Sequence, residues 1–191
     1  MGVLDDGERV HAPDAAAWRL WLETHHARSP GAFLLRGRPG FAHLHVPYED
    51  AIRQALCFGW IDGPVRTFDS ETGGLWFSPR RPSGGWAATN KARLIELEAA
   101  GLITPAGYRA IEVAKANGSW TVLDRAEAGI EPPELTAALD AVPAARRHWD
   151  AFPASVKKFG VSHIDSARRS ETRDARVAKM VADAAEGRRP L

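Results

Sequence analysis

The 191-residue sequence predicts an α+β fold: a small, mainly antiparallel sheet covered by helices, followed by an all-helical C-terminal lobe. Two runs of β-forming residues, 60–68 and 75–80, are joined by DSETGG, a turn sequence typical of a hairpin. After this hairpin, apolar residues recur at helical spacing between residues that favour helix ends. We therefore expect strands before residue 80 and helices after it.

The early elements follow from local patterns. Asp14 is suited to cap a helix that carries apolar and aromatic residues on one face: Trp18, Trp21, Leu22 and His25. The segment GAFLLRG is short, apolar and bounded by glycines, as a buried strand is. Pro47 begins the next helix and Gly59 ends it. The expected strands, whose order the sequence does not give, are residues 9–12, 31–36, 60–68 and 75–80.

The later elements are bounded by helix-capping residues. Thr104 caps a helix with Pro105 at its first position and Gly118 past its end, and Thr89 caps the preceding helix. After the acidic, proline-containing stretch RAEAGIEPPE come further helices, the last capped by Ser170. These helices are expected near residues 133–141, 143–151, 154–168 and 171–186. The sequence thus predicts an α+β domain at 1–125 and a helical segment at 132–187 that packs on it.

The composition argues against a disulfide-bonded, membrane-spanning or secreted protein. The single cysteine, Cys57, allows no internal disulfide and reads as a core thiol between Leu56 and Phe58. No apolar run approaches the roughly 18 residues that a membrane-spanning helix needs. The first ten residues include three acidic ones and no apolar region typical of a secretory signal. We therefore expect a cytoplasmic protein without a membrane span.

The formal net charge is only +1, but one segment is strongly biased. From residue 72 to residue 95 there is no acidic residue, while four cations occur: Arg80, Arg81, Lys91 and Arg93. Such a segment creates a local positive field, which favours an anionic partner.

An acidic residue, Asp62, lies inside the strand-like run FGWIDGPVRTF. Residues two apart on a strand share a face, so Trp60 and Asp62 point the same way. If the hairpin pairs in its simplest register, Trp76 and Arg80 lie on that face as well. Asp62 would then form a charge-assisted pair with the guanidinium of Arg80 or Arg81, leaving donors for an anion.

These residues predict a small-molecule site with tryptophan walls and a few converging polar groups. The SGG turn before Trp86 allows a tight backbone path, and the helix that follows offers N–H groups to an anion. The expected ligand is small and anionic or aromatic. The predicted site residues are Trp60, Asp62, Trp76, Arg80, Arg81, Trp86 and Asn90.

Two alternatives to this pocket remain open. Asp62 and Arg80 can form a structural ion pair under a tryptophan-rich core without any ligand. Asp62 can instead serve as an acid or base in an enzyme. No histidine, serine or second carboxylate stands at a spacing that pairs with it, so the catalytic residues, and whether the protein is an enzyme, are left undecided.

Metal and cofactor motifs are missing from the sequence. His43 and His45 could share a strand face, but a third ligand at a recognisable spacing, HExxH and paired CxxC motifs are all absent. The glycine patterns of dinucleotide and phosphate-binding loops are absent as well. We expect neither a metal nor a cofactor.

The C-terminal helices are rich in cations. Such residues suit nucleic acid or an anionic surface, which gives a third possibility: an interaction module acting through residues 155–189. Glu171 and Asp174 interleave with the cations, so a solvated helical face is the preferred interpretation, and nucleic acid is not the expected partner. The cations are Lys157, Lys158, Arg168, Arg169, Arg173, Arg176 and Lys179.

Several motifs occur together in an order that resembles a known bacterial family. They are ALCFGWIDG, then FSPRRPSGGW, then GLITPAGYRAIEVAKANGSW, and finally AFPASVKKFGVSHIDSARRSETRDARVAKMVADAAEG. Together they are similar to the YdeI/OmpD-associated, or bacteriocin-protection, proteins. The resemblance implies a stress-related or protective protein and carries no established reaction or catalytic residues. With the candidate site, it predicts a cofactor-free protective protein that binds a small anionic or aromatic ligand.

Overall fold

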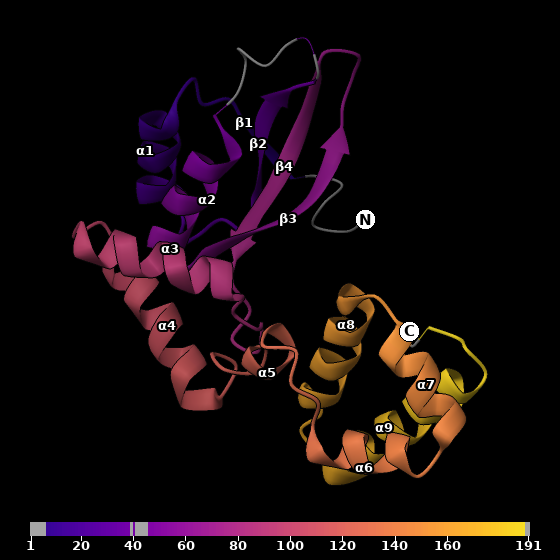
Figure 1. Ribbon diagram of the computed structural model, residues 1–191. Helices are drawn as coiled ribbons and strands as arrows, with labels where there is room; N and C mark the ends of the chain where they lie inside the picture. The colour runs from indigo at the N-terminus through magenta and orange to yellow at the C-terminus, as the bar shows by residue number, and fades with distance from the viewer. Residues whose placement is uncertain (1–6, 39, 41–45, 190–191) are drawn as a thin grey trace. The chain divides into compact units, whose positions relative to one another are not determined.

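The computed structural model describes residues 7–38, 40 and 46–189, and the chain forms two compact units (Figure 1). The N-terminal unit comprises Met1–Gly84 and Thr89–Asn117. The helical unit comprises Gly85–Ala88 and Gly118–Leu191. The short segment Gly85–Ala88 therefore belongs with the C-terminal residues and not with its neighbours in sequence.

The sheet of the N-terminal unit has four strands within the described residues. They are β1 (Glu8–Val10), β2 (Ala32–Gly37), β3 (Trp60–Thr67) and β4 (Thr72–Pro79). Their order is β1-β2-β4-β3; β1 and β2 are parallel, and the other two pairs are antiparallel. The predicted α+β class and the mainly antiparallel sheet are confirmed.

The β3–β4 hairpin is formed by a local turn and distorted by a bulge. Asp69 Oδ1 accepts hydrogen bonds from the backbone N–H groups of Glu71 at 2.8 Å and Thr72 at 2.7 Å, which closes the turn. Along β3 the register shifts between Asp62 and Val65. Gly63 and Pro64 occupy this bulge, where an edge strand tolerates a proline.

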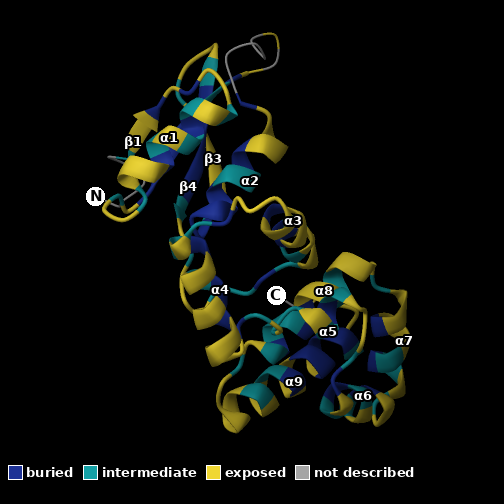
Figure 2. Ribbon diagram, turned by 90° about the vertical axis from the view of Figure 1, so that its left-hand side faces the viewer, coloured by how far each residue is buried: buried dark blue, intermediate teal, exposed yellow. Residues whose placement is uncertain are grey.

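Helices α1 (Ala15–His25) and α2 (Tyr48–Cys57) cover one face of the sheet (Figure 1). Asp14 is the N-cap of α1, as predicted, and accepts a hydrogen bond from the Ala17 N–H at 2.8 Å. The ring of Trp18 packs 5.3 Å from that of Phe77 on β4. The core of this unit, dark blue in Figure 2, therefore lies between the helices and the sheet.

Helices α3 (Ala88–Ala99) and α4 (Pro105–Asn117) follow the sheet. Thr104 caps α4 as predicted, because its hydroxyl accepts the Gly107 N–H at 3.4 Å. The predicted cap of α3 at Thr89 is wrong, since the helix already begins at Ala88. The Ala88 N–H donates to Glu127 Oε2 at 2.7 Å, so a distant carboxylate takes the place of a local cap.

The helical unit contains α5 (Asp124–Glu127), α6 (Pro133–Asp140), α7 (Pro143–Ala151), α8 (Ala154–Asp165) and α9 (Ser170–Ala185). Its core includes Leu135, Trp149 and Ile164, each fully buried. Two predictions need correction: Ser170 is the first residue of α9 and Arg169 is its cap, and α5 lies partly within the stretch that reads as a linker. Among the described residues, no helix is both long enough and apolar enough to cross a membrane.

Candidate functional site

Asp62 lies on β3 and is held by a tyrosine that the sequence did not single out. The Tyr48 hydroxyl, at the start of α2, donates a hydrogen bond to Asp62 Oδ2 over 3.2 Å. Burial, and then the charge of Asp62, raise the pKa of Tyr48, so the tyrosine keeps the proton it donates. Asp62 is half-buried beside the helices that cover the sheet.

The register of the hairpin separates two of the predicted site residues. Asp62 pairs with Phe77, and Trp60 pairs with Pro79, so these residues share a face. Trp76 therefore points to the other face, where its ring lies 4.9 Å from Phe33. The expectation that Trp76 shares a face with Asp62 is wrong. The bulge between Asp62 and Val65 shifts the pairing by one residue, so Phe77, and not Trp76, lies on the face of Asp62.

The negative charge of Asp62 interacts with the guanidinium of Arg80. Burial lowers the pKa of Arg80 to about 10, and the negative charge of Asp62 acts in the opposite direction. Arg81, next in sequence, is exposed. Of the two cations proposed as partners of Asp62, Arg80 is therefore the one whose charge is coupled to it.

A further cation, Arg93 on α3, forms hydrogen bonds with residues of α2 and α3 in the N-terminal unit. Its guanidinium donates to both carboxylate oxygens of Glu49, at 2.9 and 2.7 Å, and to Asn90 Oδ1 at 2.8 Å. These hydrogen bonds lower the pKa of Glu49 and raise that of Arg93. The positive charge of Arg93 in the acid-free segment is thus balanced by an acidic residue from α2.

The structure brings some of the seven predicted site residues together and separates the others. Asp62, Arg80 and Asn90 belong to the charged neighbourhood just described, and Trp60 is buried on the same face of the sheet as Asp62, with its ring 5.8 Å from Trp21. Trp86 belongs to the helical unit, where its ring lies 5.2 Å from Trp120. Sequence reasoning missed Tyr48, Glu49 and the role of Arg93, although each occupies the first two turns of a predicted helix.

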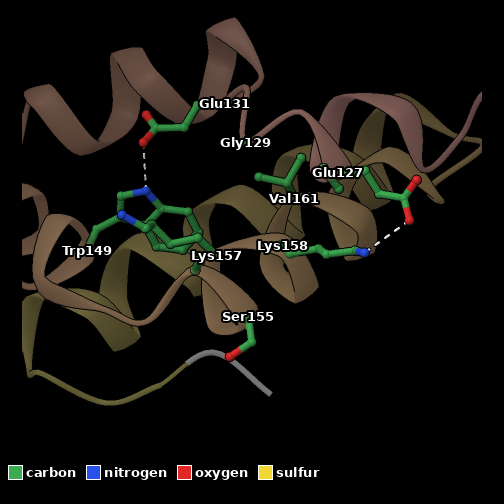
Figure 3. Close-up of a pocket in the computed structure, with 10 residues that line it drawn as sticks. Glu127, Gly129, Glu131, Trp149, Ser155, Lys157, Lys158 and Val161 are labelled. Carbon is green, nitrogen blue, oxygen red and sulfur yellow. Dashed lines mark hydrogen bonds and ion pairs between the residues drawn. The ribbon is translucent and has the colours of Figure 1, made fainter. Parts of the chain in front are cut away.

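A pocket of about 390 Å³ lies in the helical unit, bordered by α5, α7, α8 and the segment after α5 (Figure 3). It combines small and apolar groups with two carboxylates and two ammonium groups. Its lining consists of Ala126, Glu127, Gly129, Glu131, Trp149, Ala154, Ser155, Lys157, Lys158 and Val161.

One side of the pocket is held by several hydrogen bonds. Trp149 is fully buried, and its indole N–H donates to Glu131 Oε1 at 2.7 Å. Arg146 donates to both oxygens of Glu131, at 2.7 and 2.8 Å. Hydrogen bonding from Arg146 lowers the pKa of Glu131, so this carboxylate is ionised and its charge is compensated.

The other side of the pocket is cationic and more exposed. Lys158 Nζ lies 3.0 Å from Glu127 Oε1, and Lys157 Nζ donates to the Asp150 carbonyl at 3.3 Å. In Figure 3 this lysine–glutamate pair and the Trp149–Glu131 pair lie on opposite sides of Val161. Lys157 and Lys158 are in the first turns of α8, whose cap, Pro153, offers no side-chain hydrogen bond.

The pocket was not predicted from the sequence. In the sequence, Lys157 and Lys158 read as part of a solvated helical face, and Glu127 and Glu131 lie in the stretch that reads as a linker. The only signal was the position of the lysine pair shortly after Pro153, where a helix begins. Nothing local indicated that Trp149 would border the same space.

No group of three or more histidine, cysteine, aspartate or glutamate side chains in the described part of the chain could hold a metal ion. His43 and His45 lie outside the described residues.

Comparisons with known proteins give one family match in the N-terminal part of the chain and another in the C-terminal part. Residues 10–110, more than half of the chain, match the family described as Domain of unknown function (DUF8412). Residues 129–187 match the family described as Bacteriocin-protection, YdeI or OmpD-Associated, which confirms the resemblance for this C-terminal part alone. No curated protein and no solved structure gives a significant match.

Proposed function

We propose, on the premise that the chain belongs to the family described as Domain of unknown function (DUF8412), that it binds a small molecule in the pocket of its helical unit. The expected ligand has an anionic group and an apolar body. Most of the pocket's lining falls within residues 129–187, the part that matches the bacteriocin-protection family model. A protective role, in which the protein sequesters such a ligand in the cytoplasm, is consistent with that description.

The observation that carries this proposal is the composition of the pocket. Its volume of about 390 Å³ falls within the range of roughly 300–1,000 Å³ typical of small-molecule sites. Ala126, Trp149 and Val161 give it apolar surface, and a few polar groups stand at its other side. This is the combination that fixes the orientation of a small ligand.

The lysines that line the pocket are the groups that could receive an anion. Glu131 shares Arg146 with Asp150, and Glu127 is paired with Lys158. Lys157 adds a positive charge, and its ammonium group donates to a backbone carbonyl. A carboxylate or phosphate on the ligand would meet this charge and the first turn of α8, where the helix dipole also favours anions.

A second candidate concerns the sequence-predicted residues of the N-terminal unit. The specific observation in its favour is the hydrogen bond from the Tyr48 hydroxyl to Asp62, which gives Asp62 the proton-carrying partner that the sequence lacked. With Arg80 and Asn90 nearby, these groups form a site for a small anion or for acid–base chemistry. Substrate turnover lost in Asp62→Asn with the fold intact would support it.

Thermal unfolding in the presence of small molecules tests the main proposal. The panel contains anionic metabolites, nucleotides, cell-wall precursors and antimicrobial peptides, each at several concentrations. A ligand that binds only the folded protein raises the free energy of unfolding by about 2.7 kcal/mol when its free concentration is a hundred times its Kd.

Two lysine variants locate the effect. Lys157→Ala should reduce the stabilisation by an anionic ligand, because it removes a cation that lines the pocket. Lys179→Ala is the matched control, since Lys179 lies on α9 and pairs with Asp183 away from this pocket. A stabilisation that is equal in both variants would place the ligand elsewhere and contradict the proposal.

A further inference from the structure

We infer that the ligand's anionic group enters the pocket by replacing Glu127 as the ion-pair partner of Lys158. Glu127 is then a built-in competitor that sets how strongly the pocket holds an anion. This inference rests on the proposed function, because it concerns the same pocket.

The geometry places the competing groups together. Glu127 and Lys158 both line the pocket, and Glu127 Oε1 lies 3.0 Å from Lys158 Nζ. Figure 3 shows the two side chains pointing toward each other, on the other side of Val161 from Trp149. The Glu127 carboxylate therefore takes up one of the three N–H donors of the ammonium group and competes with an anionic ligand for its charge.

The pair is suited to exchange because its members differ in their exposure to solvent. The Glu127 side chain is only 13% exposed, whereas that of Lys158 is 51% exposed. An ion pair with a half-exposed lysine is weak, because water competes for the ammonium and the side chain loses freedom when it is fixed. Lys158 can therefore exchange one carboxylate for another at a small net cost.

Glu127 keeps a second partner when Lys158 leaves it. Its other oxygen, Oε2, accepts the Ala88 N–H at 2.7 Å at the start of α3. This hydrogen bond lies within the helical unit, and a backbone N–H that donates to a carboxylate stabilises its charge. The exchange thus leaves no buried carboxylate without compensation.

Glu131, the other carboxylate of the pocket, lacks this freedom. Both of its oxygens accept hydrogen bonds from Arg146, and one also accepts the Trp149 N–H. Releasing it would break several charge-assisted hydrogen bonds in a largely buried position. Lys158, and not Arg146, is therefore the cation that changes partner.

A double-mutant cycle with 1-naphthoate, a planar carboxylate, tests the exchange. Its affinity is measured by fluorescence anisotropy for the wild type, Glu127→Gln, Lys158→Met and the double variant. Glu127→Gln keeps an acceptor for the Ala88 N–H but frees Lys158, so we expect affinity to rise about fivefold, the size of a weak ion pair. The gain should disappear when Lys158 is replaced by Met.

Matched controls separate this exchange from a general change of charge. Glu171→Gln removes one exposed carboxylate from the first turn of α9 and should leave the affinity for 1-naphthoate unchanged. The neutral analogue 1-naphthylmethanol should bind the wild type and Glu127→Gln equally. A gain of the same size with and without Lys158, or weaker binding in Glu127→Gln, would overturn the inference.

A measurement on the wild type alone covers the case in which a variant does not fold. During a titration with 1-naphthoate, the NMR signals of the Lys158 side chain should shift, while the Ala88 amide stays protected from hydrogen exchange. A Lys158 signal that does not respond to bound 1-naphthoate would overturn the exchange alone. Absence of binding in both the wild type and Glu127→Gln would instead contradict the proposed function.

Discussion

The indole N–H of Trp149 donates a 2.7 Å hydrogen bond to Glu131, and this contact joins α7 to the segment that precedes α6. Trp149 is fully buried in the core of the helical unit, yet it also borders the pocket. The same contact therefore stabilises the fold and fixes one wall of the candidate site.

Replacing Glu131 should destabilise the helical unit. Glu131→Gln keeps the shape but removes the charge that Arg146 and Trp149 share, so we expect a loss of about 2 kcal/mol in the free energy of unfolding. Urea unfolding followed by circular dichroism measures it. Glu171→Gln, an exposed carboxylate on α9, is the control and should change stability by no more than about 0.5 kcal/mol.

Stability should fall in acid for the same reason. The pKa of Glu131 is lower in the folded protein than its ordinary value of 4.5. Its contribution is therefore complete above that ordinary value and is lost as the pH falls through the folded pKa. Urea unfolding between pH 6 and pH 3 should show the wild type and Glu131→Gln converging; a constant difference would contradict this.

Gly160 should not tolerate a side chain. A Cβ at this position of α8 would lie 2.9 Å from Trp149 Cη2 and 3.0 Å from the sulfur of Met180. Alanine favours a helix by about 0.5–1 kcal/mol over glycine, but overpacking against a buried tryptophan typically costs about 1–3 kcal/mol. Gly160→Ala should therefore lower the melting temperature, and a rise would show that Trp149 can move.

The pairing of Tyr48 with Asp62 should be visible in a titration. The chain has two tyrosines, so Tyr108→Phe leaves Tyr48 as the only one. Absorbance at alkaline pH should then give a pKa above 10 for Tyr48, because burial and the charge of Asp62 both raise it. Asp62→Asn should lower this pKa toward its ordinary value; no change would mean that the two groups do not interact in solution.

Local signals in the sequence predicted the elements whose ends are determined locally. Thr104, Pro105 and Gly118 bound α4 as expected, because a cap, a first-turn proline and a terminal glycine act within a few residues. Thr89 failed as a cap because the acceptor at the start of α3 is Glu127, which is 39 residues away in sequence.

The candidate sites depend on strand pairing and helix packing between residues far apart in the sequence, which no short stretch of sequence reveals. The face on which Trp76 lies is determined by the pairing of Asp62 with Phe77, and a one-residue offset reverses every side chain. The pocket depends on how α5, α7 and α8 pack together, so Trp149 and the lysine pair gave no joint signal in the sequence. Cations were recognised there, but not the cavity that they border.

The most direct test of the proposed site is to observe the pocket while a ligand binds. We would titrate 15N-labelled wild-type protein with 1-naphthoate and follow the Trp149 indole N–H signal, assigned with Trp149→Phe. The account predicts a saturable shift of this signal that Lys157→Ala weakens and Lys179→Ala does not. A Trp149 signal that stays fixed while signals elsewhere shift, or no shift at all, would contradict a ligand site in this pocket.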